Sequence, residues 1–418
     1  MRNNADLSAN TDFILKNKEI ENMKNIVIVD GVRTPFGRLG GGLRQFHTAD
    51  LGAIAIQELM KRTQLDAKEV DAVYMGTANG DARCPNFARF ASLKAGLPYE
   101  TSAVAVEMQC GSAIACMNHA AYRILAGDAD CVIVGGAESF SQRFFKFSTS
   151  QEPYKMIPPT AFASNLAPKE EDNIIMIKVA DLMAKTWGIT REECDAYALR
   201  SQQLSAKAME SGFLDNQVAP VVIPATKKTP EVIVAKDEHP RPQTNAESLA
   251  KLKTIYEGGV TTAGNASGRN DGGSALLVMT EEKAKALGYT PIARWVAGAD
   301  VGVDPKLMGI GPAYSNMKVL EKVGLKPSDI AVYECNEAFA AQNLGVIRQM
   351  ETMSGETINM DTWNPNGGAI AFGHPNGASG GRIALSAIRH MENTGGQFGL
   401  ISSCCGGGLG VSALFERM

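Results

Sequence analysis

Residues 106–113 read Val-Glu-Met-Gln-Cys-Gly-Ser-Ala, and Cys110 in this stretch lies between two different patterns of apolar residues. Before it, residues 103–108 are short and apolar, which is typical of a buried β-strand. From Ser112 onward, apolar residues recur every three or four positions, as on one face of an α-helix. Gly111 permits a tight turn, and the free amides and dipole of a helix start favour the thiolate. Since free cysteines usually only fill a core, partners elsewhere must decide the role of Cys110.

The alternation of strand and helix patterns occurs twice in the chain. It runs through residues 25–134 and returns after Pro291. Three pairs of segments correspond between the two copies: 70–75 with 329–334, the turn at Cys110 with the turn at His374, and 131–136 with 399–407. Such alternation is typical of α/β proteins. We therefore expect an α/β fold with two similar layered halves, whose equivalent turns face one another.

Residues 141–284 differ from both halves because they contain more prolines, more charge and longer helical patterns. We expect them to form an inserted lid or loop domain between an N-terminal half, 23–140, and a C-terminal half, 285–418. Residues 1–22 precede the first strand pattern and are expected to be an N-terminal extension.

Composition limits the possible partners. The chain has 418 residues, 44% of them hydrophobic, which is enough for two or three domains. No run approaches the ~20 apolar residues of a membrane span. The net charge of −4 and the scattered basic residues argue against a nucleic-acid partner. Acidic residues near the start argue against a targeting segment, and eight cysteines without a paired framework predict reduced thiols, a cytoplasmic location and no metal site.

A second informative stretch, residues 364–380, crowds glycines around His374 and Pro375. Glycine at this density indicates a close approach of the backbone to another group. A phosphate-binding loop is disfavoured because neither Gly-x-Gly-x-x-Gly nor a Lys-Ser/Thr pair is present in the required place. An ordinary turn histidine is an alternative, but the rigid frame favours a histidine held for proton transfer.

Two more motifs follow strand patterns. In residues 402–410, Cys404 and Cys405 precede a run of glycines whose amides can bind an oxyanion. A disulfide between the adjacent cysteines is a minority outcome in a reducing cell. In residues 334–340, Asn336 lies at a junction between strand and helix. It can either cap the helix or orient a water or a carbonyl group.

Together these four motifs resemble those of the thiolase family. With 264–268 and 270–272, they match that family in order and spacing over about residues 25–418. The resemblance implies a thiolase-like duplicated fold and an acyltransferase that moves an acetyl or acyl group between CoA and acyl-CoA. Such an enzyme forms or cleaves a 3-ketoacyl-CoA such as acetoacetyl-CoA. No permanently bound cofactor is implied, since CoA and acyl-CoA are substrates, and a homodimer or homotetramer is expected.

The resemblance also implies roles for single residues. Cys110 would take the acyl group, His374 would accept its proton, and Cys404 would move a proton at the α-carbon of the second acyl-CoA. Asn336, through a water, and His374 would form one oxyanion site, and the amides of Cys110 and Gly406 the other. The residues expected to bind CoA are Arg241 and Ser248 near the nucleotide, Ser267, Ala338 and Phe339 near the pantetheine, and Met176 in the segment that shapes the acyl and pantetheine pocket.

Several positions depart from the family pattern. Glu107 replaces a small polar residue, Ser403 an aliphatic residue and Arg269 another aliphatic residue, and Cys405 is unusual beside Cys404. A carboxylate beside the thiol disfavours the thiolate unless it is paired or turned away. Residues 175–181 also replace a common Met-Gly-x-Thr-Ala-Glu run, which bears on substrate choice.

Three alternatives to a short-chain thiolase follow from these departures. One is a medium-chain, long-chain or otherwise specialised thiolase of degradation. Another is a ketosynthase, which is disfavoured because such enzymes use a second histidine or an asparagine where this chain has Cys404. The third is a thiolase-like protein that binds acyl-CoA without turnover.

Overall fold

The computed structural model describes residues 25–149 and 152–418, so the predicted extension over 1–22 lies outside the described residues. The strands are β1 (Ile26–Arg33), β2 (Gly37–Arg38), β3 (Ala72–Gly76), β4 (Ser102–Val106), β5 (Cys131–Ser139), β6 (Lys146–Phe147), β7 (Ala161–Phe162), β8 (Val221–Ile223), β9 (Val232–Val234), β10 (Asn270–Thr280), β11 (Ala293–Gly302), β12 (Val332–Cys335), β13 (Phe398–Cys405) and β14 (Leu409–Arg417). The α-helices are α2 (Thr48–Thr63), α3 (Phe87–Lys94), α4 (Ser112–Leu125), α5 (Met176–Trp187), α6 (Arg191–Glu210), α7 (Ala246–Ala250), α8 (Glu281–Ala286), α9 (Gly311–Val323), α10 (Ala340–Ser354), α11 (Ala369–Phe372) and α12 (Asn376–Thr394).

One large mixed sheet organises the described residues. Its strand order is β12-β13-β14-β11-β1-β10-β5-β3-β4, with β2 paired to β10. β1 and β11 join the two halves as antiparallel neighbours, for example through the pair Ile26 and Trp295. Both strands are largely buried, and β1 accordingly begins with a run of apolar β-branched residues.

The strand order confirms that the fold is duplicated. On the N-terminal side, β5 lies between the parallel strand β3 and the antiparallel strand β10. On the C-terminal side, β13 lies in the same way between β12 and β14. A short 3-10 turn precedes each of the corresponding strands β3 and β12. The counterpart of β4 is reduced to a single parallel bridge between Tyr333 and Trp363.

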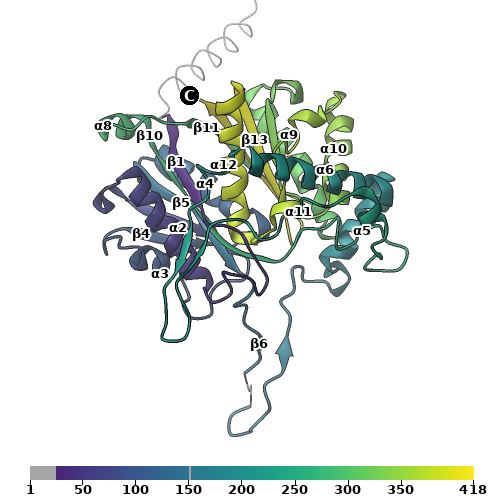
Figure 1. The fold of residues 1–418 in the computed structure, drawn as a ribbon, viewed down its shortest axis with the longest axis horizontal. Coiled ribbons are helices and arrows are strands. Elements are labelled where there is room, and N and C mark those ends of the chain that lie inside the picture. Colours follow the sequence, from purple (N-terminus) through teal and green to yellow (C-terminus); the bar gives the residue numbers. More distant parts are fainter. Residues whose placement is uncertain (1–24, 150–151) are drawn as a thin grey trace, which may run out of the picture.

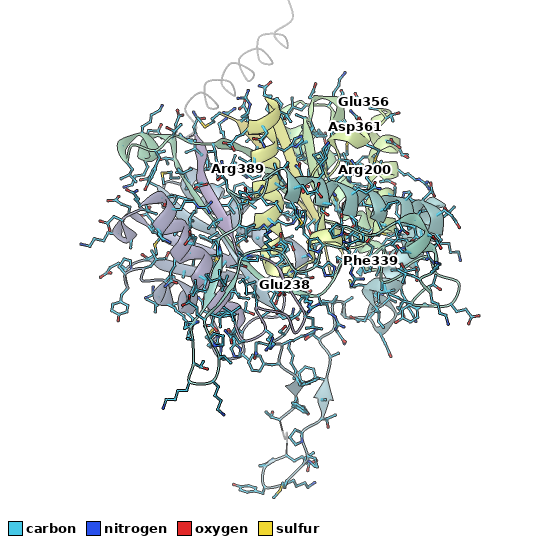
Figure 2. The ribbon with its side chains drawn as sticks, viewed as in Figure 1. Arg200, Glu238, Phe339, Glu356, Asp361 and Arg389 are labelled. Atoms are coloured by element: carbon cyan, nitrogen blue, oxygen red, sulfur yellow. The ribbon has the colours of Figure 1, made fainter. Side chains whose placement is uncertain are left out.

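The helices form layers on both sides of this sheet. α2 and α3 pack on the N-terminal half, and α9 and α10 pack on the C-terminal half. α4 and α12 pack against each other in the middle, within a buried cluster that also includes strand residues of both halves. Figure 1 shows α12 between the two halves. Arg389 on α12, labelled in Figure 2, pairs with Asp30 of β1 at 2.6 Å.

β4 corrects the sequence prediction of a buried strand before Cys110. This strand is shorter than the predicted 103–108 and has no ladder partner besides β3 among the described residues. Its residues are exposed or half-buried, and Val104 is 40% exposed. An edge strand of small and β-branched residues has the same sequence pattern as a buried one, so the pattern alone did not reveal its position.

The segment between the halves contains the β6–β7 hairpin, α5, α6 and α7. The hairpin projects from the body of the molecule (Figure 1). β10, near the end of the predicted insertion 141–284, pairs with β1 and β5 and therefore belongs to the central sheet. The division of the chain at residues 140 and 284 remains a prediction. Within the part of the chain that the structure describes, no helix is both long and apolar enough to cross a membrane.

Candidate active site

Cys110 lies in a 3-10 turn, Gln109–Gly111, directly before α4. Ser112 Oγ accepts a hydrogen bond from the Met108 amide at 2.9 Å, which closes the turn. A β-carbon at Gly111 would lie 2.5 Å from Cys405 Sγ, so the absence of a side chain there allows the C-terminal half to approach this closely. The turn packs against both α12 and β13. It therefore lies where the two halves meet.

The Cys110 thiol is protonated in the free protein. Burial raises its pKa to about 12, and the charges of Glu138 and, less strongly, Glu107 raise it further, against a lowering by a backbone hydrogen bond. The residue is nevertheless partly exposed. The backbone hydrogen bond acts in the direction predicted for a helix start, but desolvation outweighs it in the free protein. A base must therefore take the proton when the sulfur attacks.

His374 precedes α12 and is buried. Its backbone amide donates to Asn270 Oδ1 at 3.0 Å. Nδ1 is 2.6 Å from Ser379 Oγ, and that hydroxyl lies 3.1 Å from the Pro375 carbonyl, to which it can donate. We assign the proton to Nδ1 on this network, which leaves Nε2 free to accept from Asn336 Nδ2 at 3.3 Å.

The pKa of His374 is lowered to about 3, mainly by burial and also by the positive charge of Arg382. The imidazole is therefore neutral near pH 7, and its Nε2 lone pair accepts the long hydrogen bond from Asn336. A neutral, fixed imidazole is suited to receive a proton in the transition state.

Asn336 follows β12 and is buried. Its backbone N–H donates to the Ser402 carbonyl at 2.9 Å, which links the residue to β13. The alternative that it caps a helix is wrong, because α10 begins after Phe339. Asn336 Oδ1 is buried and has no hydrogen-bond partner among the described residues. A buried amide with one free polar atom is suited to orient a water or a polar group of a substrate.

Cys404 lies near the end of β13 and is fully buried. Burial raises its pKa well above the ordinary value, and the neighbouring Cys110 thiol contributes. Both residues are free cysteines, as is Cys405, so the adjacent pair forms no disulfide here. A β-carbon at Gly406 would lie 3.3 Å from Gln109 Cγ, which places the glycine turn against the Cys110 turn. The structure thus brings the two thiols and Gly406 together.

Glu107 is both paired and exposed. Its carboxylate accepts from the Gln109 amide at 2.8 Å and from Gln109 Nε2 at 2.6 Å. A carboxylate beside the thiol disfavours the thiolate unless it is paired or turned away, and these two hydrogen bonds pair the Glu107 carboxylate. Glu107 still contributes to the high pKa of Cys110, but it is a lesser cause than burial and Glu138.

The predicted pantetheine residues lie side by side. Ser267 donates its amide proton to the Ala338 carbonyl at 3.0 Å, and Ala266 pairs with Phe339 in an isolated bridge. Two residues later, Arg269 pairs with His374 in a parallel bridge. Phe339 is half-buried and is labelled in Figure 2. This segment therefore leads directly to the buried imidazole.

The remaining predicted CoA residues lie on the inserted segment. Arg241 has an exposed side chain, and its backbone amide donates to Gln202 Oε1 at 2.9 Å. Ser248 is exposed, and its hydroxyl bonds to the Asn245 carbonyl at 2.7 Å at the start of α7. Met176 is the first residue of α5 and is partly buried. None of these side chains forms a hydrogen bond to Cys110, His374 or Cys404 among the described residues.

Two residues of the site were missed by the sequence prediction. Ser379 fixes the ring of His374 from the first turn of α12, and nothing in its local sequence distinguishes it from other serines. Glu138 is fully buried and accepts from the amides of Ala78, Asn79 and Gly377. An acidic residue within the apolar run of β5 was a usable signal, because a buried carboxylate needs partners.

Comparison with known proteins identifies the family. The thiolase N-terminal domain matches residues 26–282, and the thiolase C-terminal domain matches residues 289–417. The chain is 43% identical over 408 residues to a 3-oxoadipyl-CoA/3-oxo-5,6-dehydrosuberyl-CoA thiolase of Escherichia coli K12, with 95% of this chain and 100% of the relative covered. It is 39% identical over 401 residues to an acetyl-CoA acetyltransferase of Syntrophomonas wolfei, with 94% and 100% covered.

Solved structures agree with these relatives. The acetyl-CoA acetyltransferase of Bacillus anthracis superposes with a TM-score of 0.88 at 38% identity, with 95% of this chain and 99% of that chain covered. Human mitochondrial 3-ketoacyl-CoA thiolase in complex with CoA superposes with a TM-score of 0.86 at 34% identity, with 94% and 98% covered.

Proposed function

The chain belongs to the thiolase family and is an acyltransferase, and we propose that it transfers acyl groups between CoA and a 3-ketoacyl-CoA through a thioester on Cys110. The main support is that the turns of Cys110 and His374 meet. The Cys110 turn packs on α12, which begins just after His374, and Cys110 lies next to Cys404. The neutral base and the protonated thiol are the forms that such a reaction requires at rest.

Cleavage of a 3-ketoacyl-CoA begins with proton transfer from Cys110 to Nε2 of His374. The sulfur bonds to the 3-keto carbon, the bond between C2 and C3 breaks, and the departing carbanion takes a proton from Cys404. This step yields acetyl-CoA and acyl-Cys110. CoA then gives its thiol proton to Cys404 and attacks the acyl-Cys110 thioester, and the released Cys110 sulfur recovers its proton from His374. The condensation reaction follows the same steps in reverse.

Negative charge develops on the carbonyl oxygen in both steps. Asn336, through a water, and His374 would stabilise it in one step, and the backbone amides of Cys110 and Gly406 in the other. The unpaired Oδ1 of Asn336 supports a bound water at this place, because that oxygen needs a donor. CoA would be bound by Ser267, Ala338 and Phe339 close to the reaction centre, and by Arg241, Ser248 and Met176 farther along the inserted segment.

A homodimer or homotetramer fits the exposed edge of β4. Unpaired edge strands with apolar side chains are usually covered in stable proteins, and Val104 is such a residue here. A second copy of the chain would cover this edge. The cytoplasmic location remains a prediction from the cysteine content.

Thiolysis of acetoacetyl-CoA tests the proposal. Wild-type protein with acetoacetyl-CoA and CoA should form acetyl-CoA, and Cys110→Ser should abolish this reaction. Cys84→Ser is the matched control, since Cys84 is also partly exposed, and it should retain wild-type activity. Activity retained in Cys110→Ser would contradict the proposal. Tight binding of acetoacetyl-CoA without turnover by the wild type would favour the acyl-CoA carrier instead.

A further inference from the structure

We infer that Lys146 selects the acyl group and favours a chain that ends in a carboxylate, in a cavity whose wall beside Cys110 is fixed by Gln109 and Glu107. This inference rests on the proposed acyl transfer through Cys110 and adds the residue that chooses the substrate. It begins with a cavity beside the Cys110 turn.

The cavity has a volume of about 450 Å³ and lies between the loop after β3, the end of β4 and the foot of the β6–β7 hairpin. Gln109 and Leu166 both line it. Both also lie against Gly406, because a β-carbon there would be 3.3 Å from Gln109 Cγ and 2.9 Å from Leu166 Cδ1. The cavity therefore adjoins the residue before the nucleophile and the glycine turn of the proposed oxyanion site. Cys110 itself does not line the cavity, so an acyl group on its sulfur would reach the cavity past Gln109.

Gln109 is held in an unusual conformation. Its φ is 48°, in the left-handed region that residues other than glycine rarely adopt. Glu107 stabilises this conformation by accepting from both the backbone amide and the side-chain Nε2 of Gln109. The side-chain Nε2 of Gln109 therefore faces Glu107. The side-chain Oε1 lies 3.6 Å from the position that a β-carbon on Gly406 would take. Gln109 thus presents a fixed hydrogen-bond acceptor beside the acyl group.

The far wall of the cavity contributes polar donors. Asn79, Ser164 and Asn165 line it together with Lys146. Lys146 Nζ bonds to Ser164 Oγ at 2.7 Å and has no carboxylate partner among the described residues. The two carboxylates at the cavity have other partners: Asp81 pairs with Arg83 at 2.8 Å, and Glu107, on the side of the Cys110 turn, accepts from the neutral Gln109 amides. Lys146 is therefore the cation of the far wall.

This wall fits one kind of acyl chain better than another. A terminal carboxylate can form charge-assisted hydrogen bonds with the Lys146 ammonium and with neighbouring amides. A methyl terminus would remove water from the same groups without replacing their hydrogen bonds, which is unfavourable. A site built to hydrogen-bond a group discriminates strongly against an analogue that lacks it.

Two substrates with six acyl carbons separate the carboxylate from chain length. 3-Oxoadipyl-CoA ends in a carboxylate, and 3-ketohexanoyl-CoA ends in a methyl group. For thiolysis by the full chain, we expect kcat/KM to be about tenfold or more higher for 3-oxoadipyl-CoA. Equal values, or a preference for the methyl group, overturn the inference. Acetoacetyl-CoA is assayed in parallel. If none of the three substrates is cleaved, the proposed function is wrong; if all are cleaved with equal kcat/KM, only the inferred preference for a carboxylate is wrong.

A variant then tests Lys146. Lys146→Met should lower the ratio of kcat/KM values, carboxylate over methyl, by about five- to tenfold. Lys322→Met removes an exposed lysine on α9 and should leave the ratio at the wild-type value. Thermal melts confirm that each variant is folded, and a folded Lys146→Met protein with an unchanged ratio overturns the assignment.

Discussion

The turns before α4 and before α12 occupy equivalent places in the two halves, yet they hold their functional side chains differently. Cys110 is partly exposed, and its turn is fixed by near neighbours in sequence such as Glu107 and Ser112. His374 is buried and is fixed by Asn270, Asn336 and Ser379, which come from three separate segments. The same scaffold therefore supplies a nucleophile that a substrate can reach and a base that cannot move.

The pKa values of the two functional side chains are shifted in opposite directions. Burial raises the pKa of Cys110 to about 12 and lowers that of His374 to about 3. In both cases desolvation favours the neutral form, so the resting pair is a thiol and a neutral imidazole. The ion pair forms only when a substrate carbonyl arrives and takes up the negative charge.

Removal of the buried base should have the largest effect. We expect His374→Asn to slow both acetylation of Cys110 by acetyl-CoA and overall thiolysis by about 10²- to 10⁴-fold, because the thiol loses its proton acceptor. Stopped-flow thiolysis and timed mass spectrometry measure the two steps. His119→Asn, an exposed histidine on α4, serves as the control and should behave as wild type. Unchanged acetylation in His374→Asn would show that the two turns do not act together.

The pH dependence of Cys110 reactivity tests the resting state. Since the thiolate is the reactive form and its pKa lies far above neutrality, alkylation of the free protein by iodoacetamide should rise about tenfold per pH unit between pH 6 and 9. Peptide mapping assigns the label to Cys110. A plateau near pH 7 would instead indicate a preformed pair of thiolate and imidazolium, and it would contradict the neutral pair.

Ser379 tests how far the fixed ring orientation matters. Ser379→Ala removes the partner of Nδ1, and loss of one hydrogen bond of about 1 kcal/mol corresponds to about fivefold in kcat. Ser386→Ala is the matched control, because Ser386 lies on the same helix and bonds to Glu334 at 2.6 Å. Equal losses of kcat in the two variants would mean that the effect comes from helix stability and not from His374.

Glu107 should have the smallest effect on the thiol itself. Glu107→Asn removes a negative charge that contributes least among the causes of the high pKa of Cys110. We expect alkylation of Cys110 to become faster by no more than about threefold at pH 8. A gain of more than about tenfold would contradict this ranking, because Glu107 would then be a major cause of the high pKa of Cys110.

Much of the fold could be predicted because its signals are local. The alternation of strand and helix patterns and the pairing of 70–75 with 329–334 follow from periodicity, and the strand order confirms the duplication they indicate. The edge position of β4 could not be predicted, because pairing with distant strands decides which strand lies outermost.

In the candidate site, too, local features could be predicted and features that depend on distant contacts could not. Cys110, His374, Asn336 and Cys404 stand in glycine-rich or strand-end motifs that a sequence displays directly. The high pKa of Cys110 could not be predicted, because desolvation depends on the packing of both halves around the turn, whereas the helix start is a local feature. Ser379 and the left-handed conformation of Gln109 likewise depend on contacts that no local pattern encodes.

Trapping of the acylated protein tests the central claim most directly. Wild-type protein is mixed with acetyl-CoA, quenched in acid and digested, and the cysteine peptides are analysed by mass spectrometry. The account predicts one acetyl group on the peptide that contains Cys110 and its loss when CoA is added before the quench. Acetyl on Cys404 or Cys405, or active thiolysis with no acetyl on Cys110, would contradict the assignment of Cys110 as the residue that carries the acyl group.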